Sequence, residues 1–108
     1  MALRARGIRV RRGPLALTFL AEGEADTTRV AYAITKRVGG AVERNRLRRR
    51  LRAVFVDLAR EAPGSVPAGV LLVSAGPDVS GRDPEELRND VKRLLAALET
   101  RRFGGEAP

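Results

Sequence analysis

Arginine dominates one stretch of the chain. Between Arg44 and Arg52, six of nine residues are arginine and none is acidic. A guanidinium group presents a planar fork of donors that suits phosphate oxygens. Five pairs of these arginines stand three or four residues apart, and each like-charge pair costs about 0.2–0.5 kcal/mol on an isolated helix. Because nothing in the stretch offsets this repulsion, we expect it to bind an anionic partner.

The same stretch is predicted to be a helix, because its apolar residues recur at helical spacing. At about 100° per residue these residues fall on one arc, while the arginines and Asn45 take most of the remainder. Gly39 and Gly40 let the backbone turn from a strand into the helix. Asn45 lies too far inside to cap the helix and is mildly unfavourable there, which favours a role in contact or in metal hydration. The apolar residues are Leu47, Leu51, Val54, Phe55 and Leu58.

The composition excludes several classes of function. The chain has 108 residues with no Cys and no His, so it holds no Ser-His-Asp or Cys-His catalytic set and no zinc finger. We expect no catalytic residue, no dedicated metal site and no small-molecule substrate. No apolar run approaches the roughly 20 residues of a membrane span, and the start lacks the apolar core of a signal peptide. The expected location is the cytoplasm.

The positive charge is concentrated in the first half of the chain. The net charge is +8, with +10 in residues 1–56 and −2 in residues 57–108. Such asymmetry is the electrostatic footprint of a surface that binds polyanions. A membrane surface also attracts basic helices, but here the apolar side is an ordinary core stripe without Trp. Nucleic acid is therefore the favoured partner.

Two strands are predicted before the arginine-rich helix, over residues 15–20 and 30–35, and they are expected to pair antiparallel. Alternation places Leu15, Leu17 and Phe19 on the face that packs against helices, together with Val30, Tyr32 and Ile34. The opposite face is lined by small residues and is either a plain solvated surface or one that a nucleic-acid strand can approach closely. Those small residues are Ala16, Thr18, Ala31, Ala33 and Thr35.

Residues 69–74 are predicted to form a buried central strand, apolar on both faces. Asp83-Pro84-Glu85-Glu86 has the pattern that opens a helix, with a cap, an early proline and a carboxylate that closes the box. The carboxylates Asp83, Glu85, Glu86 and Asp90 could suggest a paired-carboxylate or metal site, but capping and helix polarity explain them better. The stripe expected in the core is Leu87, Val91, Leu94, Leu95 and Leu98.

Three segments are expected along the chain. Residues 1–13 read as a basic arm or a frayed terminus, residues 14–100 as a single nucleic-acid-binding domain, and residues 101–108 as a disordered tail. The arm contains Arg9, Arg11 and Arg12 as accessory candidates for binding nucleic acid. The order β-β-α-β-α predicts an α+β domain with helices packed on one face of a small sheet. If the strands flanking the first helix are parallel, a right-handed crossover is the general expectation.

The arginine-rich stretch resembles the RNR signature of the bacterial ribonuclease P protein subunit. Lys36-Arg37-Val38-Gly39 is followed by Ala41-Val42-x-Arg44-Asn45-Arg46-x-Arg48-Arg49-x-x-Arg52, so fixed Gly, Ala, Val and Asn positions interleave with basic ones. The resemblance extends more loosely over residues 13–98. It implies a fold like the second domain of ribosomal protein S5, with a left-handed crossover, and here with the family's N-terminal helix missing or shortened.

The resemblance also implies a function, removal of the 5′ leader from precursor tRNA. Catalysis would come from the RNA subunit with its bound magnesium, and the partners would be that RNA subunit and precursor tRNA. Thr18, Ala31, Ala33 and Thr35 would face the leader, where family members often present an aromatic ring in place of Thr18. Alternatives are a ribosomal or RNA-chaperone module and a stand-alone nuclease. The residues implied to bind RNA are Lys36, Arg37, Arg44, Asn45, Arg46, Arg48, Arg49 and Arg52.

Overall fold

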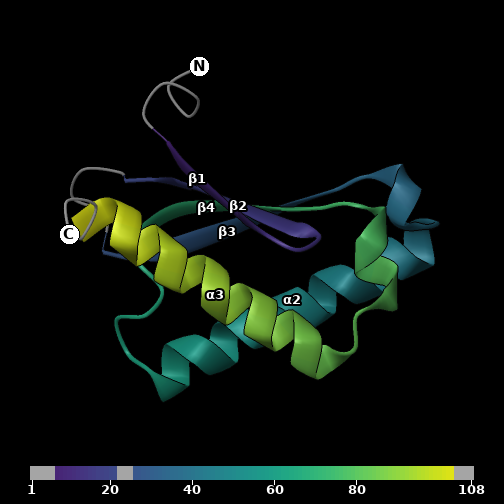
Figure 1. Cartoon of the computed structure of the whole chain (residues 1–108). Coiled ribbons are helices and arrows are strands. Elements are labelled where there is room, and N and C mark those ends of the chain that lie inside the picture. Colours follow the sequence, from purple (N-terminus) through teal and green to yellow (C-terminus); the bar gives the residue numbers. More distant parts are fainter. Residues whose placement is uncertain (1–6, 22–25, 104–108) are drawn as a thin grey trace.

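A four-stranded sheet and two long helices make up the part of the chain that the structure describes, residues 7–21 and 26–103. In this computed structural model the α+β class predicted from the sequence is confirmed (Figure 1). The elements in chain order are β1 Ile8–Arg12, β2 Leu15–Leu20, β3 Thr28–Ile34, η1 Lys36–Val38, α2 Ala41–Glu61, β4 Gly69–Ala75, η2 Pro77–Gly81 and α3 Pro84–Phe103, where η1 and η2 are short 3-10 helices.

The strands lie in the order β1-β2-β4-β3, which corrects one predicted pairing. β2 does not pair with β3; it pairs antiparallel with β4, with Leu17 opposite Val73. β3 pairs with β4 in parallel, with Tyr32 opposite Val73. The prediction joined two strands that are neighbours in sequence, whereas β4 arrives later and inserts between them. Its position confirms that β4 is a central strand.

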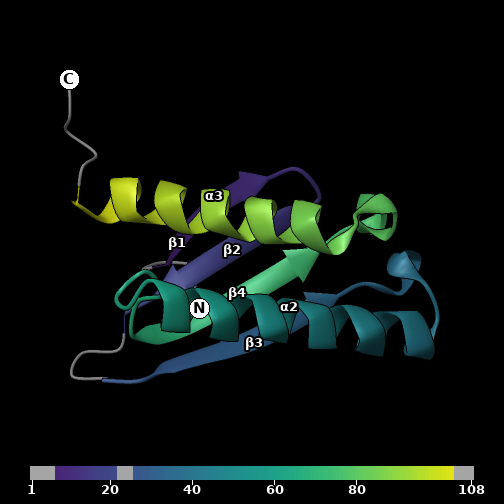
Figure 2. The ribbon, with the colours of Figure 1, turned by 90° about the horizontal axis from the view of Figure 1, so that it is seen from below.

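The connection from β3 through α2 to β4 is a β-α-β crossover between parallel strands. In Figure 2 the helices lie in front of the sheet, β3 and β4 run in the same direction, and β4 lies above β3. When the view is rotated so that β3 and β4 point upward with α2 in front of the sheet, β4 therefore lies to the left of β3. This is the left-handed sense that the family resemblance implies, against the general right-handed preference.

β1 was missed by the sequence analysis, which placed residues 1–13 in a basic arm. Residues 8–12 are instead an edge strand that pairs antiparallel with β2, with Val10 opposite Leu17. Gly13 joins the two strands with a φ of 56°, a conformation that favours glycine. The arginines at positions 4 and 6, and the question of a missing N-terminal helix, lie outside the described residues.

Both helices cover the same face of the sheet, as predicted (Figures 1 and 2). The apolar stripes of α2 and α3 meet alternate residues of β2 and β4 in one core, and only Val54 of the predicted stripes is partly rather than fully buried. On β3, Ile34 is buried whereas Val30 and Tyr32 are half-buried. Leu15, Leu17, Leu51, Leu71, Val73, Leu87, Val91, Leu94 and Leu98 are almost completely inaccessible.

The start of α3 confirms the capping interpretation for Asp83 and Glu86, whereas Asp90 is buried beside Arg82. The Glu86 backbone N–H donates to Asp83 Oδ1 at 2.8 Å, and the Asp83 N–H donates to Glu86 Oε1 at 3.0 Å. α3 continues to Phe103, so residues 101–103 are helical and not part of a disordered tail. Residues 104–108 lie outside the described residues. None of the described helices is long and apolar enough to cross a membrane.

Candidate nucleic-acid interface

A short turn orients α2 relative to the sheet. β3 ends at Ile34, η1 follows, and Gly39 and Gly40 lead into the helix. Gly39 has a φ of 154°, and a Cβ there would lie 2.9 Å from Glu43 Cβ, so a side chain at this position would be strained. Glu43 Oε1 accepts a hydrogen bond from the Gly40 N–H at 3.1 Å and so caps the helix. Lys36 and Arg37 lie exposed in η1, beside this start.

The arginines of α2 form two flanks. We call Arg44, Arg48 and Arg52 the β3 flank, because their spacing of four residues puts them on one side and Arg52 acts electrostatically on Tyr32 of β3. Arg46 and Arg50 form the α3 flank, because they line a pocket together with Leu87 of α3. Asn45 and Arg49 lie on the crest between the flanks and are exposed. The eight residues that the resemblance implies to bind RNA lie on α2 or η1, whereas the accessory candidates Arg9, Arg11 and Arg12 lie on β1.

The charge partners of the α2 arginines decide what this surface can bind. Within residues 7–21 and 26–103, no ion pair includes any arginine between positions 44 and 52. Arg48 Nη1 donates to Asn45 Oδ1 at 2.7 Å, so Asn45 orients the Arg48 side chain. Arg44 Nε is buried without a hydrogen-bond acceptor. This surface therefore keeps both its positive charge and unused donors, as a phosphate-binding surface requires.

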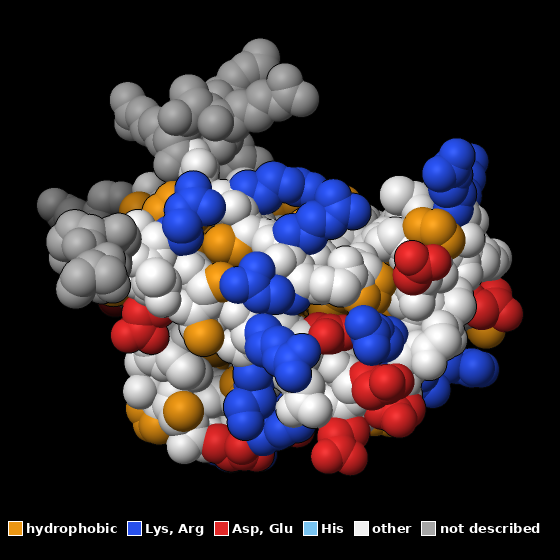
Figure 3. Space-filling model, viewed as in Figure 1, with side chains coloured by type: hydrophobic (Ala, Val, Ile, Leu, Met, Phe, Trp, Pro, Cys, Tyr) orange, Lys and Arg blue, Asp and Glu red, His pale blue; other side chains and the backbone are white. Residues whose placement is uncertain are grey.

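The charges around α3 are arranged differently. Arg82 Nε lies 3.4 Å from Asp90 Oδ2, and Arg82 Nη1 lies 3.6 Å from Glu86 Oε2. Arg88 forms an ion pair with Glu61 of α2. In Figure 3 basic side chains lie along the upper part of this face and continue down through its middle, and acidic side chains lie among and beside them toward the lower and right-hand edges. The α3 side of the molecule is thus balanced in charge, unlike α2.

The open face of the sheet contains most of the residues implied to face the leader. Ala31 and Ala33 are exposed on β3, and Thr18 is half-buried on β2. Thr35 follows the end of β3 and is exposed before η1, so it is not part of the sheet. Ala16 is buried although it belongs to the same face.

β1 adds two arginines to this open face. The register places Arg9 opposite Thr18 and Arg11 opposite Ala16. Arg9 Nη1 donates to Thr18 Oγ1 at 3.3 Å. Arg12 alternates to the other side, pairs with Leu15 and donates to the Arg11 carbonyl at 2.6 Å. The alternation of Ile8 and Val10 with arginines was the available signal for this strand.

The fold changes the acidity of Tyr32 on β3. Burial raises the pKa of the Tyr32 hydroxyl, and the positive charge of Arg52 opposes that rise. This coupling links β3 to the β3 flank of α2. Sequence reasoning placed Tyr32 on the helix-packed face but did not identify its electrostatic interaction with Arg52.

Comparison with known proteins identifies the family. The ribonuclease P family model matches residues 2–99. The ribonuclease P protein component of Gluconacetobacter diazotrophicus is 41% identical over 91 residues, which cover 83% of this chain and 76% of that protein. The component from Streptomyces bikiniensis is 33% identical over 103 residues, covering 82% of this chain and 81% of its own.

Solved structures agree on the fold. A Staphylococcus aureus RNase P protein mutant with defective mRNA degradation activity has a TM-score of 0.78 at 20% identity, covering 90% of this chain and 79% of its own. The RNase P protein from Thermotoga maritima has a TM-score of 0.72 at 21% identity, covering 88% and 86%. The chain belongs to the ribonuclease P protein family and serves as a protein subunit of that ribonuclease in tRNA processing, with RNA as its partner.

Proposed function

We propose that α2 and η1 bind the catalytic RNA subunit of ribonuclease P through Lys36, Arg37, Arg44, Asn45, Arg46, Arg48, Arg49 and Arg52. The observation that carries this proposal is the absence of acidic partners for the arginines of α2 within the described residues. Five repulsive arginine pairs on one helix are stabilised when phosphates lie between them. Binding releases counterions from the RNA, so affinity falls steeply with salt.

In this proposal the RNA subunit, with magnesium bound to it, cleaves precursor tRNA in the cytoplasm. The protein reduces repulsion between the phosphates of the two RNAs and so lowers the magnesium concentration that assembly needs. Its own side chains bind and orient RNA, since the chain has neither His nor Cys.

The open face of the sheet is proposed to receive the 5′ leader. Ala31 and Ala33 are small and exposed, so a strand of RNA can approach the backbone there. Arg9 and Arg11 at the β1 edge supply positive charge beside Thr18 and Ala16. No aromatic ring lies at Thr18, so base stacking worth roughly 1–3 kcal/mol per base is weakened at this position.

Reconstitution with the RNA subunit at low magnesium tests this function. We expect cleavage of precursor tRNA only when both components are present. Cleavage by the protein alone would assign catalysis to the protein. An absence of any stimulation by the protein, with RNA binding intact, would leave an RNA-binding module without a processing role and would contradict the proposal.

Leader recognition has its own test, because it uses a different face. We expect the holoenzyme to prefer precursor tRNA over mature tRNA only weakly, since stacking at Thr18 is missing. Affinities for a precursor with a leader of several nucleotides and for mature tRNA give the comparison. A large preference that disappears when the protein is omitted would show that Arg9, Arg11 or another surface replaces the stacking interaction.

A further inference from the structure

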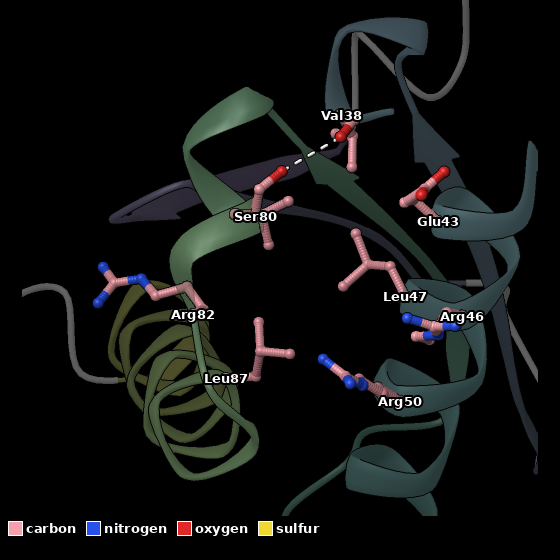
Figure 4. Close-up of a pocket in the computed structure, with 9 residues that line it drawn as sticks. Val38, Glu43, Arg46, Leu47, Arg50, Ser80, Arg82 and Leu87 are labelled. Atoms are coloured by element: carbon pink, nitrogen blue, oxygen red, sulfur yellow. Dashed lines mark hydrogen bonds between the residues drawn. The ribbon is translucent and has the colours of Figure 1, made fainter. Parts of the chain in front are cut away.

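A pocket of about 150 Å³ lies between α2 and the start of α3, beside η1 and η2. Its apolar wall is formed by Val38, Leu47, Val79 and Leu87. Ser80 of η2 donates its hydroxyl to the Val38 carbonyl at 3.1 Å, which ties the two short helices together along one side (Figure 4). The pocket is therefore built from four separate elements of the fold.

The α3 flank of α2 supplies the charged side of the pocket. Figure 4 shows that Arg50 extends from α2 toward Leu87, across the space between the two helices. Arg46 lies one turn earlier on the same side of the pocket. Neither arginine has an acidic partner among the described residues. Two available guanidinium groups thus lie beside an apolar wall.

The other polar groups of the pocket are already engaged. Glu43 accepts from the Gly40 N–H, and Arg82 is paired with Glu86 and Asp90. In Figure 4 the guanidinium of Arg82 points away from the pocket. The groups free to meet a ligand are therefore apolar side chains and the two arginines of the α3 flank. An inorganic phosphate would bind the arginines but would make no favourable contact with the apolar wall.

We propose that this pocket receives one unpaired nucleobase of the RNA partner, with Arg50 over the ring and Arg46 on the adjoining phosphate. A guanidinium plane stacks on a base, and apolar side chains accept its other face. The volume is below the roughly 300–1,000 Å³ of sites for drug-sized ligands, which fits a single base. An extruded base can enter the pocket, whereas a paired base cannot. Because Ser80 and Glu43 already form other hydrogen bonds, the pocket reads the identity of the base only weakly.

This inference rests on the proposed RNA-binding role of α2 and adds a particular contact to it. The test compares two RNA hairpins of the same stem, one fully paired and one with a single bulged nucleotide. We expect the full-length protein to bind the bulged hairpin about tenfold more tightly, within the range that stacking of one base supplies. Bulged adenine and bulged uracil are expected to differ by less than this.

Arg50→Gln should abolish the preference for the bulge, whereas Arg49→Gln on the crest should keep it. Both variants remove one positive charge from α2, so both bind the paired hairpin somewhat less tightly, and only the ratio of the affinities for the bulged and paired hairpins separates the two variants. A bulged 4-thiouridine should crosslink to the peptides that contain Val38 or Leu87.

Four outcomes decide between the inference and its alternatives. Equal affinity of the wild-type protein for both hairpins, or a preference that survives Arg50→Gln, would overturn the nucleobase site. Crosslinks confined to β3 or the open sheet face would place the base elsewhere. A failure to bind either hairpin would instead contradict the proposed RNA-binding function of α2.

Discussion

α2 and α3 lie side by side on one face of the sheet, yet their charged side chains differ in whether they form ion pairs. In α3, Asp90 and Glu86 share Arg82, and Arg88 is paired with Glu61. In α2, the arginines of both flanks have no acidic partner among the described residues. Paired charges contribute to folding, whereas unpaired like charges oppose it and become favourable when a polyanion binds. The contrast separates a structural helix from a binding helix.

The largest expected effect is stabilisation of the folded protein by an oligonucleotide. A ligand that binds only the folded state stabilises it by about 2.7 kcal/mol at one hundred times its dissociation constant. For a domain of this size we expect the melting temperature to rise by about 10 °C. Thermal unfolding with a short RNA, against sodium chloride at matched ionic strength, measures it. The absence of a shift would mean that the folded protein has no anion-binding surface. Sulfate is a poorer probe because it stabilises proteins generally.

Removal of Arg82 should destabilise the fold by about 2 kcal/mol, because it leaves Asp90 without its countercharge. The Asp90 side chain is only 7% exposed. Arg88→Met is the matched control, since its partner Glu61 is 57% exposed and such pairs contribute roughly 0–1 kcal/mol. Denaturant unfolding of Arg82→Met and Arg88→Met gives the comparison. Similar losses in both variants would refute a structural role specific to Arg82, and Asp90→Asn should restore part of the loss.

Replacing one arginine of α2 by an uncharged residue should stabilise the free protein, whereas removing Arg82 should destabilise it. Arg49→Gln removes repulsion with Arg46 and with Arg52, worth about 0.4–1 kcal/mol together. Its free energy of unfolding should rise while its affinity for RNA falls. A variant that is less stable than the wild-type protein would indicate that Arg49 makes a stabilising contact in the free state.

The smallest effect concerns Tyr32 at high pH. Burial raises the pKa of Tyr32 above its ordinary value of 10.0, so the unfolded chain loses its phenolic proton first. The stability contributed by the neutral hydroxyl is complete below about pH 10 and is lost as the pH rises through the higher folded pKa. Because the chain has one tyrosine, ultraviolet titration reports this pKa directly. Tyr32→Phe should not show this loss.

Arg52→Gln sharpens that measurement. Arg52 favours the charged phenolate of Tyr32, so removing it should raise the pKa of Tyr32 further. Arg46→Gln, on the α3 flank, should leave the Tyr32 titration where it is. An equal response to both substitutions would contradict the division of α2 into two flanks.

The parts of the fold that depend on local pattern could be predicted from the sequence. The stripes of α2 and α3 repeat at helical spacing, and the cap at Asp83 involves residues three positions apart. β1 was missed because only Ile8 and Val10 are apolar in a run of arginines, although their alternation has the period of a strand. The pairing of β2 with β4 depends on residues fifty to sixty positions apart, and no local pattern reports it.

In the candidate site, too, local features could be predicted from the sequence and long-range packing could not. The RNR stretch identified the arginines of α2, because their types and spacing are local properties. The division into flanks depends on where β3 and α3 pack, and the pocket beside Arg50 requires η1, η2 and α3 to meet. Asp90 lies within the predicted helix, but its burial became evident only when Arg82 and the β1–β2 turn were placed around it.

The salt dependence of binding to the RNA subunit tests most directly whether the arginines of α2 form the RNA interface. Arg48→Gln and Arg52→Gln together should reduce the slope of log affinity against log salt by about two, one for each lost phosphate contact. Lys92→Gln with Arg93→Gln, two exposed basic residues of α3, should leave the slope unchanged. An unchanged slope in the α2 variant, or an equal reduction in the α3 variant, would contradict the assignment of RNA binding to α2.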